Sequence, residues 1–252
     1  MTDRLSKILS IVNENRKIEV SKLSELLDVS QVTIRKDLDI LSEKGLINRE
    51  HGYAVLNESD DINNRLAVNY NIKLKIAKSA AETVSNGETI MIESGSSCAI
   101  FAEEVAKSKK DITIMSNSAF IASYIRQYSN CKVILLGGEY QKESQVNVGP
   151  ITKICAEQFY VDKLFIGIDG FSPTIGFMAS DLMRAEAVKS MAASARKVII
   201  LSDSTKFDRH GLVNLFSIGD IDALYTDANI PDKICETFER KGIHVITVST
   251  AT

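Results

Sequence analysis

The stretch DVSQVTIRKDL, residues 28–38, decides how the first part of the chain folds. Ser30 follows a polar break after a leucine-rich segment, and a serine in this position caps the first turn of a helix. Ile34 and Leu38 then recur at helical spacing, which predicts a helix with this side buried. Gly45 suits the position just beyond the end of a helix, so the helix is expected to stop there.

The opposite side of this predicted helix is polar and partly basic. Ser30, Gln31 and Thr33 lie at its N-terminal tip, where free N–H groups and the helix dipole attract a phosphate. Arg35 and Lys36 follow on the exposed side, an arrangement that suits docking in a DNA major groove. Charged helix faces are usually only solvated, however, so this charge does not by itself establish DNA binding.

Two amphipathic segments precede this helix and a short hairpin follows it. Ser21 is the expected N-cap of the second segment. The inward residues of the two segments are predicted to be Leu5, Ile8, Leu9, Val12, Leu23, Leu26 and Leu27. LINREHGYAVL (46–56) alternates around Gly52 and predicts a β-wing, where Arg49 or His51 could reach a phosphate. Helix, helix, short turn, helix and wing make up the winged helix-turn-helix layout, which also occurs in modules that bind protein partners.

The length and charge of the chain limit its class. Its 252 residues allow one small and one ordinary domain, predicted as residues 1–57 and 73–252 with a linker at 58–72. A net charge of -3 argues against a protein that coats nucleic acid or membrane, but a local basic patch suffices for one DNA site. The sequence has no signal peptide and no membrane-spanning run, which predicts a cytoplasmic protein. Four scattered cysteines and three scattered histidines predict neither disulfides nor a metal site.

After Lys73 the pattern changes to apolar strands that alternate with amphipathic helices. The predicted strands are residues 89–92, 112–115, 132–136, 163–167, 197–201, 223–226 and 244–248. This alternation predicts an α/β domain with a mainly parallel sheet.

Small or polar residues follow five of these strands, and ligands bind beyond the carboxyl ends of parallel strands. The loops are Glu93-Ser94-Gly95-Ser96-Ser97, Ser116-Asn117-Ser118, Gly137-Gly138, Asp169-Gly170 and Ser202-Asp203-Ser204-Thr205-Lys206. Small polar residues that open a helix provide N–H groups and hydroxyls for an anion. We expect residues 94–97 to hold a phosphate with Lys206 as its counter-charge, and Glu93, Asn117 and Asp169 to bind sugar hydroxyls.

The sequence shows no motif of a known catalytic mechanism. It contains no Ser/His/Asp arrangement, no Gly-x-Gly-x-x-Gly and no phosphate loop that ends in Gly-Lys-Ser/Thr. Four carboxylates could still meet in one site for proton transfer: Glu93, Asp169, Glu186 and Asp203. The residues alone therefore leave catalysis open.

With these residues laid out, the chain resembles the DeoR family of bacterial transcriptional regulators over essentially its full length. VSQVTIRKDLDILSEKGLINREHG resembles the recognition helix and wing of that family. The ordered motifs KLKIAKSAA, IESGSS, SNS, LLGG, IDG, RAEAVKSM and LSDSTKF resemble its second domain. Each motif is weak alone, but the ordered set is specific.

The resemblance implies a winged helix-turn-helix domain fused to a sensor domain similar in fold to ribose-5-phosphate isomerase and coenzyme A transferases. It implies a repressor of a sugar uptake or catabolism operon that binds double-stranded operator DNA as a homodimer or homotetramer, without a cofactor. By position, the DNA residues would be Ser30, Gln31, Thr33, Arg35, Lys36 and His51. The residues for a phosphorylated sugar would be Ser94, Gly95, Ser96, Ser97, Asn117, Asp169 and Lys206, with Glu93 beside them.

Two departures from the family pattern, and one difference from isomerases of the same fold, bear on these expectations. Tyr53 replaces the second glycine of the His-Gly-Gly wing, and Glu93 replaces an aspartate. Isomerases of this fold resemble one another in an Asp-Gly-Ala-Asp run, whereas residues 169–172 read Asp-Gly-Phe-Ser and lack the second acid. We therefore expect binding without turnover, and keep a sugar-phosphate isomerase with an accessory head as the alternative.

Overall fold

The structure is a computed structural model, and it describes residues 3–43, 47–55 and 61–250. The chain divides into two compact units, Met1–Asn71 and Ile72–Thr252. The first has the winged helix-turn-helix order and the second is an α/β domain, so the predicted fold class is confirmed. Within the described ranges, no helix has the length and apolar character needed to cross a membrane.

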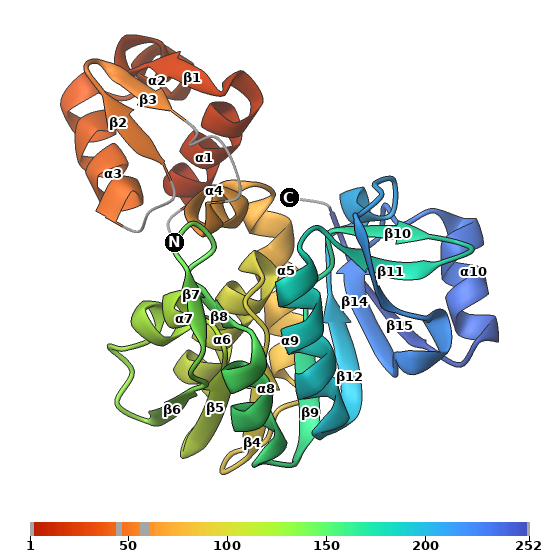
Figure 1. Ribbon diagram of the computed structural model, residues 1–252. Coiled ribbons are helices and arrows are strands. Elements are labelled where there is room, and N and C mark those ends of the chain that lie inside the picture. The colour runs from red at the N-terminus through yellow and green to blue at the C-terminus, as the bar shows by residue number, and fades with distance from the viewer. Residues whose placement is uncertain (1–2, 44–46, 56–60, 251–252) are drawn as a thin grey trace. The chain divides into compact units, whose positions relative to one another are not determined.

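The first unit combines helices with a small antiparallel sheet (Figure 1). Its helices are α1 (Asp3–Asn15), α2 (Val20–Leu27), α3 (Gln31–Glu43) and α4 (Ile62–Ala67). Its sheet has the order β1 (Lys17–Glu19), β3 (Tyr53–Val55), β2 (Asn48–Glu50). Because α4 buries Ile62 and Leu66, the second half of the predicted linker is helical and contributes to a core.

The local predictions for α1 and α3 hold. All four apolar residues predicted to face inward from α1 are buried, and so are Ile34, Leu38 and Leu41 of α3. The Ser30 hydroxyl accepts a hydrogen bond from the Thr33 backbone N–H at 3.2 Å, which confirms it as the cap of α3. The predicted helix end at Gly45 lies outside the described residues.

Two predictions for α2 are wrong. The helix begins at Val20 directly after β1, a strand that the sequence did not reveal, so Ser21 lies inside its first turn and Glu19 occupies the N-cap. Leu26 is 54% exposed. The buried side of this short helix centres on Val20 and Leu23, and Leu26 falls beyond the edge of that arc at 100° per residue.

The second unit is built on a seven-stranded sheet in which all strands are parallel. Its order is β15 (His244–Val248), β14 (Ala223–Asp227), β12 (Ala195–Leu201), β9 (Val161–Ile166), β4 (Thr89–Ile92), β5 (Ile112–Ser116), β6 (Cys131–Leu135). Each corresponds to one of the seven predicted strands, to within two residues at either end, and the predicted parallel sheet is confirmed.

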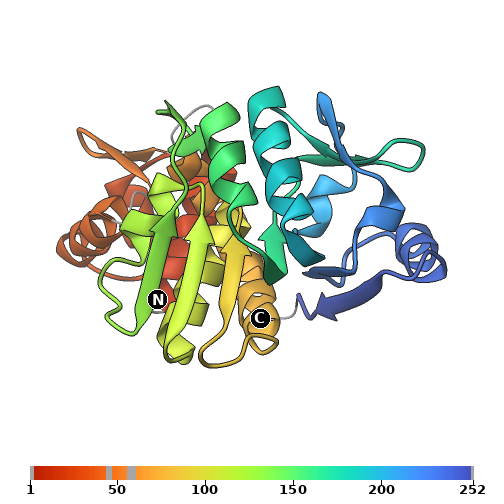
Figure 2. The ribbon, with the colours of Figure 1, turned by 60° about the horizontal axis from the view of Figure 1, so that its bottom comes forward.

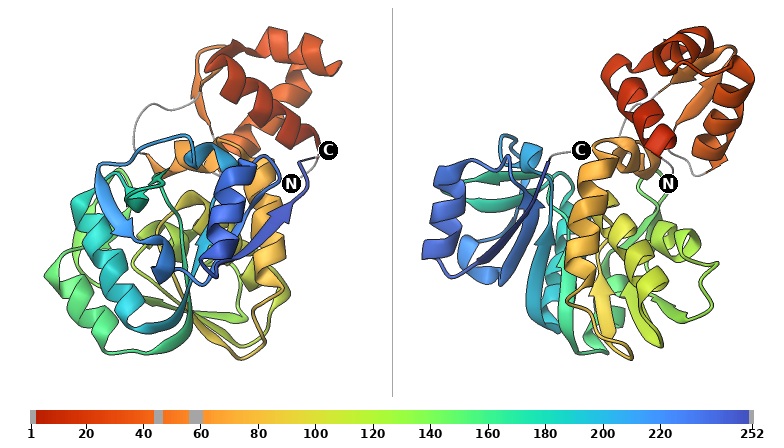
Figure 3. Two further views of the ribbon diagram at one scale, coloured as in Figure 1. Left: turned by 90° about the vertical axis from the view of Figure 1, so that its right-hand side faces the viewer. Right: turned by 180° about the vertical axis from the view of Figure 1, so that it is seen from behind.

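Helices cover both faces of this sheet. They are α5 (Tyr70–Ala81), α6 (Ser96–Ser108), α7 (Ala119–Tyr124), α8 (Pro150–Glu157), α9 (Leu182–Ala193) and α10 (Asp232–Arg240). Figures 1 and 2 show α8 and α9 side by side on one face, and the view from behind in Figure 3 shows α5 and α6 on the other.

The chain reverses its direction across the sheet between β4 and β9. From β4 it proceeds through β5 to β6, then returns to β9 and continues through β12 and β14 to β15. Crossovers between parallel strands are right-handed, so helices of the two directions lie on opposite faces. In such a sheet, the site of ligand binding is the carboxyl edge at this reversal.

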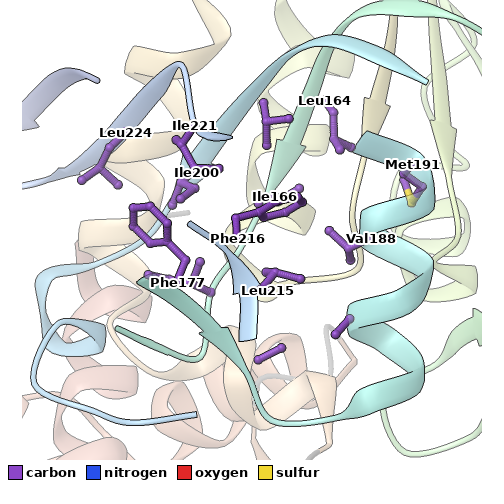
Figure 4. Packing of buried hydrophobic residues seen from close by; sticks show 14 of the residues in the cluster. Leu164, Ile166, Phe177, Val188, Met191, Ile200, Leu215, Phe216, Ile221 and Leu224 are labelled. Carbon is purple, nitrogen blue, oxygen red and sulfur yellow. The ribbon is translucent and has the colours of Figure 1, made fainter. Parts of the chain in front are cut away.

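Two smaller sheets were not predicted. The strands β10 (Gly170–Ser172), β11 (Gly176–Ala179) and β13 (Val213–Phe216) form one, and β7 (Glu139–Gln141) and β8 (Val146–Val148) form the other. Figure 4 shows Phe177, Leu215 and Phe216 of the first sheet packed towards Ile166 and Ile200 of the main sheet. The sheet of β10, β11 and β13 thus completes the hydrophobic core beside α9.

Phe238 of α10 lies at the centre of an aromatic cluster. Its ring centroid is 5.1 to 5.8 Å from those of Phe171, Phe177 and Phe207, which is the range of attractive ring contacts. The side chain is fully buried. The cluster therefore joins α10, the small sheet and the loop after β12.

We predict that Phe238→Ala lowers the free energy of unfolding by about 3–5 kcal/mol, because it opens a cavity among three other rings. Urea unfolding followed by circular dichroism measures the loss. Leu212→Ala is the control, since Leu212 is 82% exposed and its truncation should change the stability by less than about 0.5 kcal/mol. Equal effects of the two variants would contradict the buried position of Phe238 in the aromatic cluster.

Candidate functional site

The five predicted loops lie next to one another. The strands that precede them are consecutive neighbours in the sheet, in the order β12, β9, β4, β5, β6, and all end at the same edge. Neighbouring strands are about 4.8 Å apart, so the loop with Lys206 after β12 lies roughly 10 Å along the edge from the loop with Ser94 after β4. The structure thus brings all five loops to the carboxyl edge at the chain reversal.

Glu93 joins the loop after β4 to the loop after β9, the two strands between which the chain reverses its direction. Its Oε2 accepts hydrogen bonds from the backbone N–H groups of Gly95, at 2.8 Å, and Gly167, at 3.1 Å, while its Oε1 accepts one from Ser94 Oγ at 3.0 Å. The Cβ of a side chain at Gly95 would lie 3.5 Å from Gly167 Cα, so the two loops approach closely. Glu93 is buried and directed at the protein backbone, a position that suits fixing the loops rather than contacting a sugar hydroxyl.

The loop after β4 opens helix α6 beside a buried lysine. Ser96 and Ser97 form the first turn of α6, with Gly95 at the N-cap. Lys73 of α5 is buried and its Nζ donates a hydrogen bond to Ser96 Oγ at 3.0 Å. An ammonium group and a helix N-terminus at one place both favour an anion. Sequence reasoning did not select Lys73, although it opens the KLKIAKSAA motif, because nothing in that pattern shows that it is buried.

Asn117 follows β5 and is fully buried. Its Nδ2 donates to the carbonyl oxygen of Asn147 at 3.1 Å. Its Oδ1 accepts no hydrogen bond from the residues that the structure describes. A buried acceptor without a donor is costly, so this oxygen is suited to receive a hydrogen bond from a ligand or water.

Asp169 and Lys206 lie on the other side of the reversal. Asp169 Oδ2 accepts a hydrogen bond from the Ser180 backbone N–H at 2.9 Å, just before α9. Lys206 ends the short helix η1 (Ser204–Lys206) and is partly exposed.

Asp227, at the end of β14, fixes the loop that carries Lys206. Its two carboxylate oxygens accept hydrogen bonds from Ser204, one from the backbone N–H at 2.7 Å and one from Oγ at 2.8 Å. Asp227 is fully buried. It lies at the end of a sixth strand, where the run Asp227-Ala228-Asn229 contains no serine or glycine like those of the five selected loops, and sequence reasoning did not select it.

The described residues hold no cluster of three or more metal-binding side chains. The cysteines in this part of the chain are not disulfide-bonded. Burial raises the pKa of the Cys131 thiol to about 11, so it is almost entirely protonated at neutral pH and is a poor nucleophile.

The first unit presents α3 as its candidate nucleic-acid surface. Gln31, Arg35 and Lys36 are exposed, as is Ser30 before the helix, and Thr33 is half-buried. Within the described ranges, neither Arg35 nor Lys36 forms an ion pair. A bidentate pair between Arg4 and the buried Asp37 fixes α3 against α1, with Nε–Oδ2 2.5 Å and Nη2–Oδ1 3.0 Å.

The charged residues of the wing are largely paired within the unit. Arg49 forms an ion pair with Asp39 of α3, and Lys17 pairs with Glu50 at 2.5 Å. Arg49 is thus bound to α3, and its contact with a phosphate stays a prediction. His51 remains exposed at the turn between β2 and β3.

Tyr53, which departs from the family pattern, attaches the wing to β1. Its hydroxyl donates to Glu19 Oε1 at 2.7 Å, and Lys17 Nζ lies 4.8 Å from the ring centroid. This hydrogen bond raises the pKa of Tyr53 and lowers the pKa of Glu19, which also accepts from Ser21. Tyr53 therefore holds the wing in place through contacts within the unit.

Comparison with known families covers most of the chain. Residues 4–60 match the DeoR-like helix-turn-helix domain, and residues 68–228 match the DeoR C-terminal sensor domain.

Full-length relatives are similar along almost the whole chain. The transcriptional regulator GolR of Listeria innocua is 31% identical over 96% of this chain and 97% of its own. The glycerol-3-phosphate regulon repressor of Escherichia coli is 30% identical over 93% and 94%, and the L-fucose operon activator of Haemophilus influenzae is 27% identical over 98% and 100%.

Solved structures show a more distant likeness. Ribose 5-phosphate isomerase A of Methanocaldococcus jannaschii is 21% identical with a TM-score of 0.42, over 55% of each chain. The eIF2B beta subunit of Chaetomium thermophilum is 14% identical with a TM-score of 0.45, over 62% of this chain and 50% of that one.

We predict that Glu93→Ala destabilises the second unit by about 2–4 kcal/mol, because it leaves two backbone N–H groups at the reversal without an acceptor. Glu93→Gln is the matched control, since an amide oxygen can accept from both N–H groups and its NH₂ can donate to Ser94. Thermal unfolding measures both. If both variants melted like the wild type, Glu93 would not be the residue that joins the loops.

Proposed function

This chain belongs to the DeoR family of transcriptional regulators, and on that premise we propose that α3 reads operator DNA while the carboxyl edge of the sheet binds a phosphorylated sugar. The observation that carries the second half of the proposal is that Lys73 bonds to Ser96 at the N-terminus of α6, at the same edge of the sheet as the loop of Lys206. We therefore propose a cytoplasmic location, because the operator DNA lies in the cytoplasm.

The DNA-binding half is supported by the distribution of charge in the first unit. Arg4, Lys17 and Arg49 are each paired with a carboxylate, whereas Arg35 and Lys36 on the exposed side of α3 are not paired with any described residue. Unpaired cations at the N-terminal half of a recognition helix suit phosphates and base edges. His51 at the tip of the wing is the remaining candidate contact.

The effector half is supported by the chemistry of the loops. Ser96 and Ser97 offer hydroxyls and N–H groups to a phosphate, and Lys73 and Lys206 supply positive charge from either side. Asn117 Oδ1 offers a buried acceptor to a sugar hydroxyl. Asp169 lies two strands away from Asn117 and can bind a second hydroxyl.

Relatives of this chain regulate in both directions. The glycerol-3-phosphate regulon protein is a repressor and the L-fucose operon protein is an activator. We propose repression for this chain, with a ligand that changes the balance between conformations of different operator affinity.

We propose that the sugar phosphate is bound without being turned over. Asp169 is followed by Gly170 and the buried Phe171, and the Ser172 hydroxyl pairs with that of Thr174. The second carboxylate of a proton-transfer pair is therefore not in this run.

We predict that Lys36→Ala weakens operator binding and reduces the slope of log K against log salt by about 1, because one phosphate contact is lost. Fluorescence anisotropy at several salt concentrations measures both quantities. Lys189→Ala on α9 is the control for a lost positive charge and should leave the slope unchanged. Loss of operator affinity with an unchanged slope would instead indicate a base contact.

We predict that Lys206→Ala weakens sugar-phosphate binding roughly 10- to 100-fold, since a hydrogen bond to a charged group contributes about 1.5–3 kcal/mol. A thermal-shift titration with a panel of sugar phosphates and the free sugars measures this. Lys110→Ala, at the opposite edge of the sheet, is the control. Unchanged affinity in Lys206→Ala would remove Lys206 from the site, and turnover of the bound compound would contradict a sensor role.

A further inference from the structure

Helix α8 is oriented opposite to what its composition favours. Thr152 and Ala156, two small residues one turn apart, are buried against the rest of the unit. Ile151 and Ile154, the largest apolar residues of the helix, are 59% and 58% exposed. Buried small residues under exposed isoleucines are unfavourable for a helix that faces only water.

The exposed isoleucines belong to a larger apolar surface. The start of α9 lies beside the start of α8, because Met183 Cε is 3.6 Å from the Cβ position of a side chain at Gly149. Figure 2 shows the two helices side by side on one face of the sheet. We name as the α8 surface the exposed residues Ile151, Ile154, Phe159, Tyr160, Leu182 and Met183. A patch of several large apolar side chains marks a site of association.

The charges on α8 indicate what covers this surface. Lys153 and Glu157 lie one turn apart along the same side of Ile154, 61% and 50% exposed, with Nζ and Oε1 3.8 Å apart. The two opposite charges lie at equal distances on either side of Cys155. If two copies of α8 pack antiparallel about that point, Lys153 of each faces Glu157 of the other, so the helix is complementary to itself.

We propose that the α8 surface is where a second copy of this chain binds, with α8 packed antiparallel against α8 of the partner. All residues of the α8 surface lie in the second unit. Only the need for a second copy rests on the proposed function, because helix-turn-helix proteins read two half-sites with two heads.

The first test is the mass of the protein without DNA or sugar, measured by analytical ultracentrifugation at micromolar concentration. The wild type should sediment at an even multiple of the 27.8 kDa chain, and Ile154→Glu at half that multiple or less. Leu26→Glu, which places the same charge on an exposed leucine of the first unit, should keep the wild-type mass. A monomeric wild type would overturn the proposal and leave the surface to another partner, and an Ile154→Glu protein of unchanged mass would overturn it too.

A charge exchange tests the antiparallel arrangement. Lys153→Glu alone and Glu157→Lys alone each place like charges opposite one another in the pair, and should weaken association about tenfold or more. An equimolar mixture of the two variants should regain wild-type association, because each contact then joins opposite charges. The pair within each helix stays broken in the mixture, so only contacts between chains explain the recovery. A mixture that remains dissociated overturns the α8-to-α8 arrangement.

The association test is independent of the proposed DNA and effector binding. A variant that associates normally but does not bind operator would count against the role of α3 and leave the α8 surface intact. A monomeric Ile154→Glu protein that still gives a thermal shift with a sugar phosphate would show that its sensor unit is folded.

Discussion

The carboxylate of Glu93 bonded to two backbone N–H groups is the interaction on which the second unit depends. Gly95 follows β4 and Gly167 follows β9, the two strands between which the chain reverses its direction across the sheet. Only two residue pairs join these strands in register, Met91 with Leu164 and Ile92 with Phe165. The side chain of Glu93 extends that short contact into the loops, so a buried carboxylate joins the two strands beyond the point where their backbone pairing ends.

The sequence allowed the main sheet to be predicted strand by strand, because each strand is a short apolar run between turn residues. It did not reveal β1, or the small sheet of β10, β11 and β13. These strands are three or four residues long, and they form because distant segments such as residues 213–216 come to lie beside β11. The misassigned start of α2 has the same origin, since β1 exists only through its pairing with β3.

The sequence allowed the loops of the candidate site to be predicted, but not the buried residues that hold these loops in place. Runs of Ser, Gly and Asn after strands identify an edge that can bind an anion, and the parallel sheet brings five such runs together. Lys73 and Asp227 were missed because a lysine in an amphipathic helix and an aspartate at the end of a strand are normally solvated. Their burial is a property of the assembled unit. Glu93 was selected as a sugar contact, but its hydrogen bond to the backbone of Gly167, 74 residues away, could not be predicted from the sequence.

The pairing of β4 with β9 also determines how long β4 waits for its neighbour during synthesis of the chain. Met91 and Leu164 are separated by 73 residues, which at 5–20 residues per second take about 4 to 15 s to synthesise on the ribosome. For that interval β4 has β5 and then β6 on one side and an open, apolar edge on the other. The nascent chain therefore exposes the strand edge that β9 later covers, and the half of the sheet with α6 and α7 is synthesised before the loops after β9 and β12 can join the proposed binding edge.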